Sequence, residues 1–139
     1  MFGFRKKAKR PEDAKVLAIA VSHAQRRQVS KWAMANNAWV VQYVDDTSST
    51  DQAPCDRESI GSWLLDPPKP WDIMAIDAAI DVFSEVDHAL DLVDWCRGHN
   101  KRCVFIRDGI DSRDEIPDES WRKAFPGQKS ARFSDDVTK

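Results

Sequence analysis

The sequence lacks the features that mark membrane-spanning and secreted proteins. No apolar run approaches the roughly 18 residues that a membrane span needs, and no signal-peptide pattern opens the chain. The three cysteines are odd in number and have no CxxC spacing, which argues against a disulfide framework. These absences predict a cytoplasmic protein with no membrane partner.

The sequence also lacks the common nucleotide and hydrolase motifs. It has no GxGxxG after a strand and no GxxxxGK[ST], so neither a dinucleotide nor a P-loop nucleotide is implied. It has no G-x-S-x-G nucleophile elbow either. We therefore predict no cofactor.

Two groups of residues raise the question of a metal ion. Cys96, His99 and Cys103 have C-x2-H-x3-C spacing, but zinc would need a fourth ligand from elsewhere, and the group straddles a helix end and a strand. Asp45 and Asp46 could bind a cation as paired carboxylates, although the entrance of a solvated loop is the commoner setting for such a pair. We predict no metal site.

Charge is present in both signs but unevenly placed. The net charge is −2, yet residues 1–15 carry +4 and the remainder −6. A basic arm on an acidic body could contact phosphate, whereas a solvated terminus is the usual role of such an arm. The basic residues are Arg5, Lys6, Lys7, Lys9, Arg10 and Lys15.

Short apolar runs alternate with amphipathic stretches along most of the chain. This order predicts an α/β fold, a three-layer α/β/α arrangement with a mostly parallel sheet of four to five strands. Asn36-Asn37 is a plausible left-handed helix end. Strands are predicted over 15–21, 39–44, 71–76 and 102–107, and helices over 24–37, 57–65 and 82–97.

These patterns divide the chain into three parts. Residues 1–14 are predicted to be a basic, flexible arm, 15–112 the α/β domain, and 113–139 a polar C-terminal tail with a short helix. In that tail, Asp118 could cap a helix over 118–125, and Trp121 could pack back on the body.

The order and spacing of several motifs resemble the catalytic domain of serine recombinases, the resolvase/invertase family. AIAVS matches the family's Y-x-R-V-S, QVSKWAMANNAWVVQYVDDTSS its first helix and second strand, and CDRESIGSWLLDPPKPWDIMAID its Arg-led helix and third strand. IDVFSEVDHALDLVDW stands where the family has D-R-L-x-R and a helix, and CVFIRDGIDS resembles its fourth strand and G-I-D-T turn. The resemblance covers about residues 15–112 and implies the resolvase catalytic-domain fold.

The resemblance also implies a site that has lost its charge. The family's serine hydroxyl attacks a DNA phosphate, and arginines hold the extra negative charge that develops on the phosphate oxygens. Here Ser22 stands at the nucleophile position and Arg57 at a phosphate-binding position. The family's other arginines are replaced by Ala20, Val82 and Glu85, and its tyrosine by Ala18.

Simpler roles compete for the same residues. Ser22 precedes a predicted helix and could serve only as its N-cap. Arg57 could be a surface or salt-bridging residue. His23 could act as a general base for Ser22, but no third group that would orient it is evident.

Three functions remain open. The first is a catalytically inactive recombinase-like domain that binds another protein or itself as a dimer; the resemblance suggests that a phage or mobile element encodes it. The second is a residual DNA-cleaving enzyme using Ser22 and Arg57, with Arg102, Arg107 or the arm in place of the missing arginines. The third is an accessory binder of nonspecific DNA through Arg5, Lys6, Lys7, Lys9 and Arg10.

Overall fold

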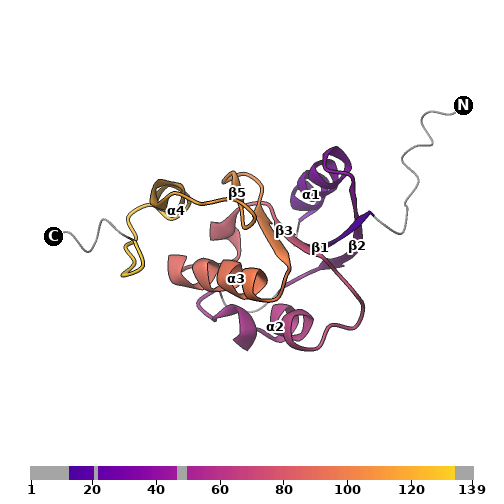
Figure 1. Ribbon diagram of the computed structural model, residues 1–139, viewed down its shortest axis with the longest axis horizontal. Coiled ribbons are helices and arrows are strands. Elements are labelled where there is room, and N and C mark those ends of the chain that lie inside the picture. The colour runs from indigo at the N-terminus through magenta and orange to yellow at the C-terminus, as the bar shows by residue number, and fades with distance from the viewer. Residues whose placement is uncertain (1–12, 21, 47–49, 134–139) are drawn as a thin grey trace, which may run out of the picture.

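The computed structural model describes residues 13–20, 22–46 and 50–133. Within them the order of strands and helices is the predicted one, including the short helix in the C-terminal tail, with two short 3₁₀ turns (η2 and η3) and a short fifth strand besides (Figure 1). The elements are β1 Ala14–Ile19, α1 His23–Ala35, β2 Ala38–Val44, η2 Pro54–Asp56, α2 Glu58–Leu65, β3 Ile73–Ile76, η3 Ala79–Asp81, α3 Val86–Gly98, β4 Arg102–Phe105, β5 Ile110–Asp111 and α4 Asp118–Ala124.

The sheet confirms the predicted fold class. Its strand order is β2-β1-β3-β4-β5, and the first four of these are parallel, while β5 pairs antiparallel with β4. Ile19, Ile76 and Phe105 stand side by side in register, so β1, β3 and β4 end at one common edge. The loops that follow these strands therefore converge there, where ligands of open α/β sheets bind.

Strand residues alternate between two apolar layers. Leu17, Met74 and Phe105 point to the layer that α2 and α3 cover, whereas Val16, Ala18 and Ala75 point to the layer under α1. Figure 1 shows α1 on one face of the sheet and α2 with α3 on the other. The period of two along buried parallel strands produces this three-layer arrangement.

Backbone chemistry explains where the helices begin and end. Asn37 has a positive φ of 54°, so the predicted left-handed end of α1 is confirmed. The helix predicted from Val82 begins only at Val86, because a 3₁₀ turn over Ala79–Asp81 comes first. The backbone N–H of Ala79 donates to the Asp108 carboxylate at 2.8 Å, which ties this turn to the loop after β4.

The segment after Ser112 packs onto the body. Trp121, Phe125 and Phe133 belong to the main apolar cluster, and Trp121 meets the Phe105 ring edge-on at 6.0 Å, so the predicted packing of Trp121 is confirmed. The predicted capping role of Asp118 is wrong, because α4 begins at Asp118 itself and Pro117 takes the cap position. Pro is well suited to a helix start, where its missing N–H costs nothing.

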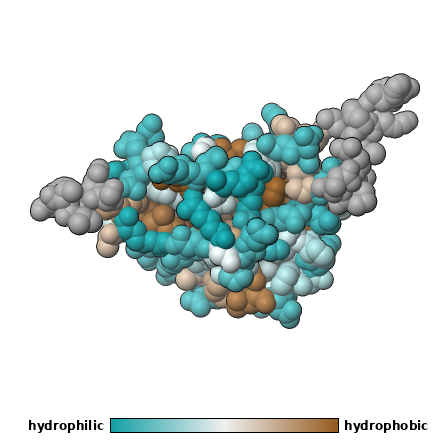
Figure 2. Space-filling model, in the orientation of Figure 1, coloured by the Kyte–Doolittle hydropathy of each residue, from teal (hydrophilic) through white to brown (hydrophobic). Residues whose placement is uncertain are grey.

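The outer surface is largely polar on the face that Figure 2 shows, with a brown patch at its lower edge, where Figure 1 places α2. Leu65 at the end of α2 is one of three large apolar side chains that are exposed among the described residues, with Met34 and Ile80. Among residues 13–20, 22–46 and 50–133, no helix is long and apolar enough to cross a bilayer.

Two helical glycines are predicted to respond oppositely to substitution by alanine. A Cβ on Gly61 would lie 2.7 Å from the backbone oxygen of Cys55, so Gly61→Ala should push α2 from η2 and lower the free energy of unfolding. A Cβ on Gly98 meets nothing within 4 Å, so Gly98→Ala should raise it, by up to about 1 kcal/mol. Urea denaturation measures both, and equal effects would contradict the close packing of α2 on η2.

Candidate functional site

The candidate site lies at the shared carboxyl edge of the parallel strands. Backbone hydrogen bonds continue the sheet by one or two residues past the strand ends. The N–H of Ala20 donates to Val44 O at 3.0 Å, and that of Arg107 donates to Asp77 O at 2.7 Å. This edge therefore holds both the predicted site residues after β1, Ala20 and Ser22, and the acidic residues after β3.

Ser22 caps the first helix at this edge. Its hydroxyl accepts from the backbone N–H of Gln25 at 3.1 Å, and the Gln25 side-chain oxygen accepts from the backbone N–H of Ser22 at 3.2 Å. This reciprocal pair is a capping box, so the capping interpretation of Ser22 is confirmed. The amide nitrogen of Gln25 donates onward to Asp81 at 3.3 Å, which links the cap to the turn after β3.

A small cavity of about 30 Å³ opens beside this cap, a volume suited to one or two water molecules. Ala20 and Val82, which the sequence resemblance matches to arginine positions of the family, both line it, so the structure brings these predicted residues together. Among the described residues its charged lining is one cation, Arg57, and two carboxylates. The complete lining is Ile19, Ala20, Gln25, Asp46, Thr50, Arg57, Asp81 and Val82.

Arg57 is fully buried, and its hydrogen bonds are made inside the protein. One Nη donates to Asp46 at 2.7 Å, the other to the carbonyls of Val82 at 2.7 Å and Thr50 at 3.0 Å, and Nε donates to Gln52 O at 3.0 Å. The guanidinium also lies over the Phe83 ring, 4.7 Å from its centroid. Four of its five N–H groups are therefore occupied, which leaves little to offer a phosphate.

A second arginine at the edge is also bound to carboxylates. Arg107 donates to Asp77 Oδ2 from Nε at 3.0 Å and from Nη2 at 2.8 Å, and lies 3.6 Å from Asp81. The hydrogen bond with Asp77 is the main cause that raises the pKa of Arg107. Burial raises the pKa of the neighbouring Asp108, and Asp81 and Asp77 raise it further, against the lowering effects of the Ala79 N–H and Arg107.

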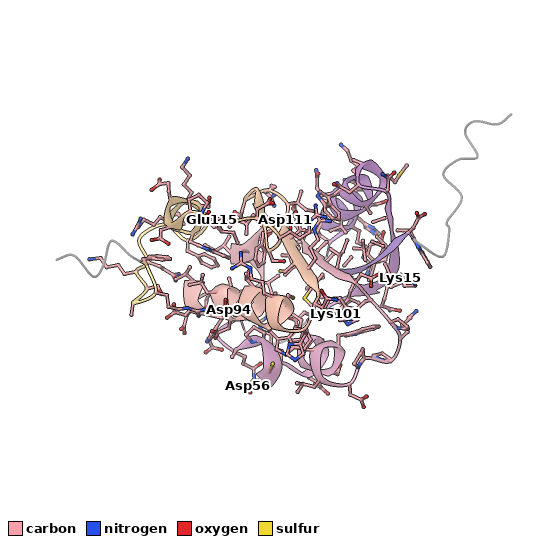
Figure 3. All side chains as sticks on the ribbon, in the orientation of Figure 1. Lys15, Asp56, Asp94, Lys101, Asp111 and Glu115 are labelled. Carbon is pink, nitrogen blue, oxygen red and sulfur yellow. The ribbon has the colours of Figure 1, made fainter. Side chains whose placement is uncertain are left out.

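Other predicted site residues lie elsewhere. Glu85 is the N-cap residue of α3, its side chain is 58% exposed, and it does not line the cavity, so the structure does not bring its charge to this site. Arg102 begins β4 at the opposite edge and pairs with Asp111, labelled in Figure 3, at 2.5 Å. His23 is exposed beside the cap, and Ala18 is buried under α1.

The remaining predictions concern metal and the basic arm. Within the described residues, no group of three or more His, Cys, Asp and Glu side chains is arranged to hold a metal ion. Cys96 and Cys103 are buried, whereas His99 is exposed and stacks on Trp95 at 3.9 Å. The arm residues Arg5, Lys6, Lys7, Lys9 and Arg10 lie outside the described residues.

Sequence reasoning missed how the charges pair. The chain separates Arg57 from Asp46 by 11 residues and Arg107 from Asp77 by 30, and no local spacing announces either pair. The available signal was position, since Asp46 and Asp77 follow predicted strands and Arg107 ends one, all at the same edge. Gln25 was missed for a different reason: a capping box needs the serine and the glutamine read together.

Replacing Ser22 separates capping from nucleophilic chemistry. Ser22→Ala is predicted to lower the free energy of unfolding by about 1 kcal/mol, because the N–H of Gln25 loses its acceptor. Ser22→Asp keeps an acceptor at the N-cap and should restore most of that stability while removing the hydroxyl. Urea denaturation measures both variants, and equal losses would contradict a capping role.

Replacing Arg57 is predicted to destabilise the fold strongly. Arg57→Gln leaves the buried carboxylate of Asp46 without its cation, which should cost about 3–5 kcal/mol. Arg57→Lys should rescue little, because a lysine cannot donate in four fixed directions. Arg113→Gln, at a 65% exposed side chain, is the matched control and should leave the urea midpoint unchanged. A wild-type midpoint for Arg57→Gln would contradict this role.

Comparison with known proteins bears on the fold. No protein-family model matches the sequence, and no curated protein matches it. The fold is similar to the N-terminal catalytic domain of TP901-1 integrase, with a TM-score of 0.60 and 17% identity, over 79% of this chain and 90% of that one. It is also similar to a resolvase family site-specific recombinase from Streptococcus pneumoniae, with a TM-score of 0.54 and 13% identity, over 74% and 78%. The predicted resemblance is confirmed at the level of structure: this chain has the fold of a serine recombinase catalytic domain.

Proposed function

We propose that this chain is a catalytically inactive serine-recombinase-like domain that acts by binding another protein or a second copy of itself. The observation that carries this proposal is the pairing of Arg57 and Arg107 with carboxylates of the same chain. A phosphoryl-transfer site needs cationic donors aimed at the phosphate oxygens, and here the donors beside the cavity are already bound.

The missing donors would reduce the rate severely. Loss of one preorganised donor typically costs about 10²–10³ in rate, and such losses do not simply add. Ala20 and Val82 line the cavity with methyl groups, and Asp46 and Asp81 line it with negative charge. A phosphodiester would meet carboxylates in place of guanidinium groups, so the site repels the group that it would have to bind.

A residual enzyme has few donors left to recruit. Arg102 lies at the opposite edge of the sheet, where it pairs with Asp111 and stacks over the Trp32 ring. Arg107 would have to release Asp77, whose side chain is 5% exposed. Freeing that arginine for DNA would leave a buried carboxylate without its cation, which is energetically unfavourable.

The proposal predicts no DNA strand transfer. The wild-type chain and Ser22→Ala should both leave supercoiled plasmid unrelaxed and form no covalent adduct with duplex DNA, with an active serine recombinase assayed in parallel. Denaturing gel electrophoresis of end-labelled DNA measures the adduct. A protein–DNA adduct that appears with the wild-type chain and disappears with Ser22→Ala would overturn the proposal.

A further inference from the structure

Three carboxylates and one exposed apolar side chain lie on the turn after β3 and on the loop after β4 that is hydrogen-bonded to it. We name this group the acidic edge: Asp77, Asp81 and Asp108, with Ile80 between them and Arg107 across them. The Ala79 N–H joins this turn to Asp108 at 2.8 Å, and Arg107 contacts Asp77 at 2.8 Å and Asp81 at 3.6 Å. One guanidinium thus contacts two of the three carboxylates, which leaves an excess of negative charge.

Asp77 shows that this charge is incompletely satisfied. Its side chain is 5% exposed, and while Oδ2 receives both bonds from Arg107, Oδ1 is buried without a hydrogen-bond partner. A buried carboxylate oxygen without a donor is unfavourable, and most such oxygens in proteins are paired. The Arg107 and Asp81 side chains are 62% and 36% exposed, so a second cation can approach the cluster from solvent at Asp81.

Ile80 supplies an apolar contact beside the charges. It is 49% exposed on the 3₁₀ turn, directly between Ala79 and Asp81. An exposed apolar side chain on the same turn as an exposed carboxylate suits a polypeptide that carries both basic and apolar side chains. It does not suit DNA, whose phosphates the carboxylates would repel.

The sequence of this chain contains such a segment. Residues 5–10 hold five basic side chains, and Phe2 and Phe4 precede them. These residues join the fold at the amino end of β1, whereas the acidic edge lies past the carboxyl ends of β1 and β3. A 12-residue segment spans at most about 40 Å, which is enough to reach a neighbouring molecule.

We propose that the acidic edge of one copy binds the basic N-terminal segment of a second copy. Reciprocal exchange of the two segments closes a dimer, and one-way exchange builds longer assemblies. This inference rests on the proposed function, because it names the partner that an inactive domain binds through its altered catalytic edge. It also gives the +4 segment and the −6 body complementary roles.

The test measures self-association of the full chain and binding of a free peptide. Sedimentation should show mass that increases with concentration and falls at high salt, because salt screens exposed charges. A fluorescent peptide with the sequence of residues 1–12 should bind the full chain and compete with this association. Asp81→Asn and Ile80→Ser should each weaken peptide binding roughly threefold to fivefold.

Matched controls lie at the other edge of the sheet. Asp66→Asn at the end of α2 removes the same charge, and Met34→Ser near the end of α1 removes an apolar side chain that is 54% exposed. Both should bind the peptide as the wild type does. Arg107→Gln should strengthen peptide binding, because the Asp77 carboxylate loses its internal cation. Thermal melts confirm that each variant is folded at the assay temperature.

Four results would overturn the inference. The chain stays monomeric at every concentration, the peptide does not bind, or the peptide binds Asp81→Asn as well as the wild type. The fourth is that duplex DNA binds at the acidic edge and displaces the peptide from it. The monomeric result includes the case in which the N-terminal segment binds the acidic edge of the same molecule. None of the first three would affect the proposed lack of strand transfer, which the adduct assay tests separately.

Discussion

The burial of one arginine organises the carboxyl edge of this fold. The guanidinium of Arg57 joins the segment after β2, through Asp46 and Thr50, to the segment after β3, through Val82. A charge removed from water is tolerated only when hydrogen bonds and an opposite charge replace its hydration, and here four bonds do so. The loops at the edge are consequently held by an internal ion pair, and its arginine has four of its five N–H groups occupied within the protein.

The electrostatics of the edge thus run opposite to what the fold would suggest. Parallel strands place the residues that follow them along one edge of the sheet, and ligands of α/β proteins bind at this edge. In this chain Asp46, Asp77 and Asp81 lie at that edge. Both nearby arginines, Arg57 and Arg107, are bound to these carboxylates. The backbone geometry is that of a recombinase domain, while the charge is that of a surface that attracts cations.

Much of the fold was predictable because its signals are local. A run such as Ile73–Ile76, buried at every position, indicates a strand enclosed on both faces, and Asn37 marks a left-handed helix end on its own. The late start of α3 was not predictable, because the turn before it depends on a hydrogen bond from Ala79 to Asp108, 29 residues away. The packing of the segment after Ser112 was underestimated, because its apolar residues are spread among charges and no periodic pattern unites Trp121 with Phe133.

The site was predictable in position and less so in chemistry. Ala20 and Val82 do meet at one cavity, since a resemblance of sequence order carries over to spatial order when the fold is shared. Glu85 does not join them, because α3 begins one residue later and takes it as the N-cap. Charge pairing was beyond sequence reasoning, since whether an arginine such as Arg57 is available depends on which carboxylate the tertiary structure places beside it.

A serine that only the order of sequence motifs matches to a nucleophile position is weak evidence for catalysis when the position is also a helix N-cap. Ser22 completes a capping box with Gln25, and serine is among the best residues for that purpose whatever the chemistry nearby. Selection for stability alone would therefore keep it. Arginine has no comparable structural reason to stand at Ala20 or Val82, since both positions line a small cavity where a long cation would need a partner. Under the proposed function, Ala20 and Val82, and not Ser22, are consequently the positions that bear on the lack of phosphoryl transfer.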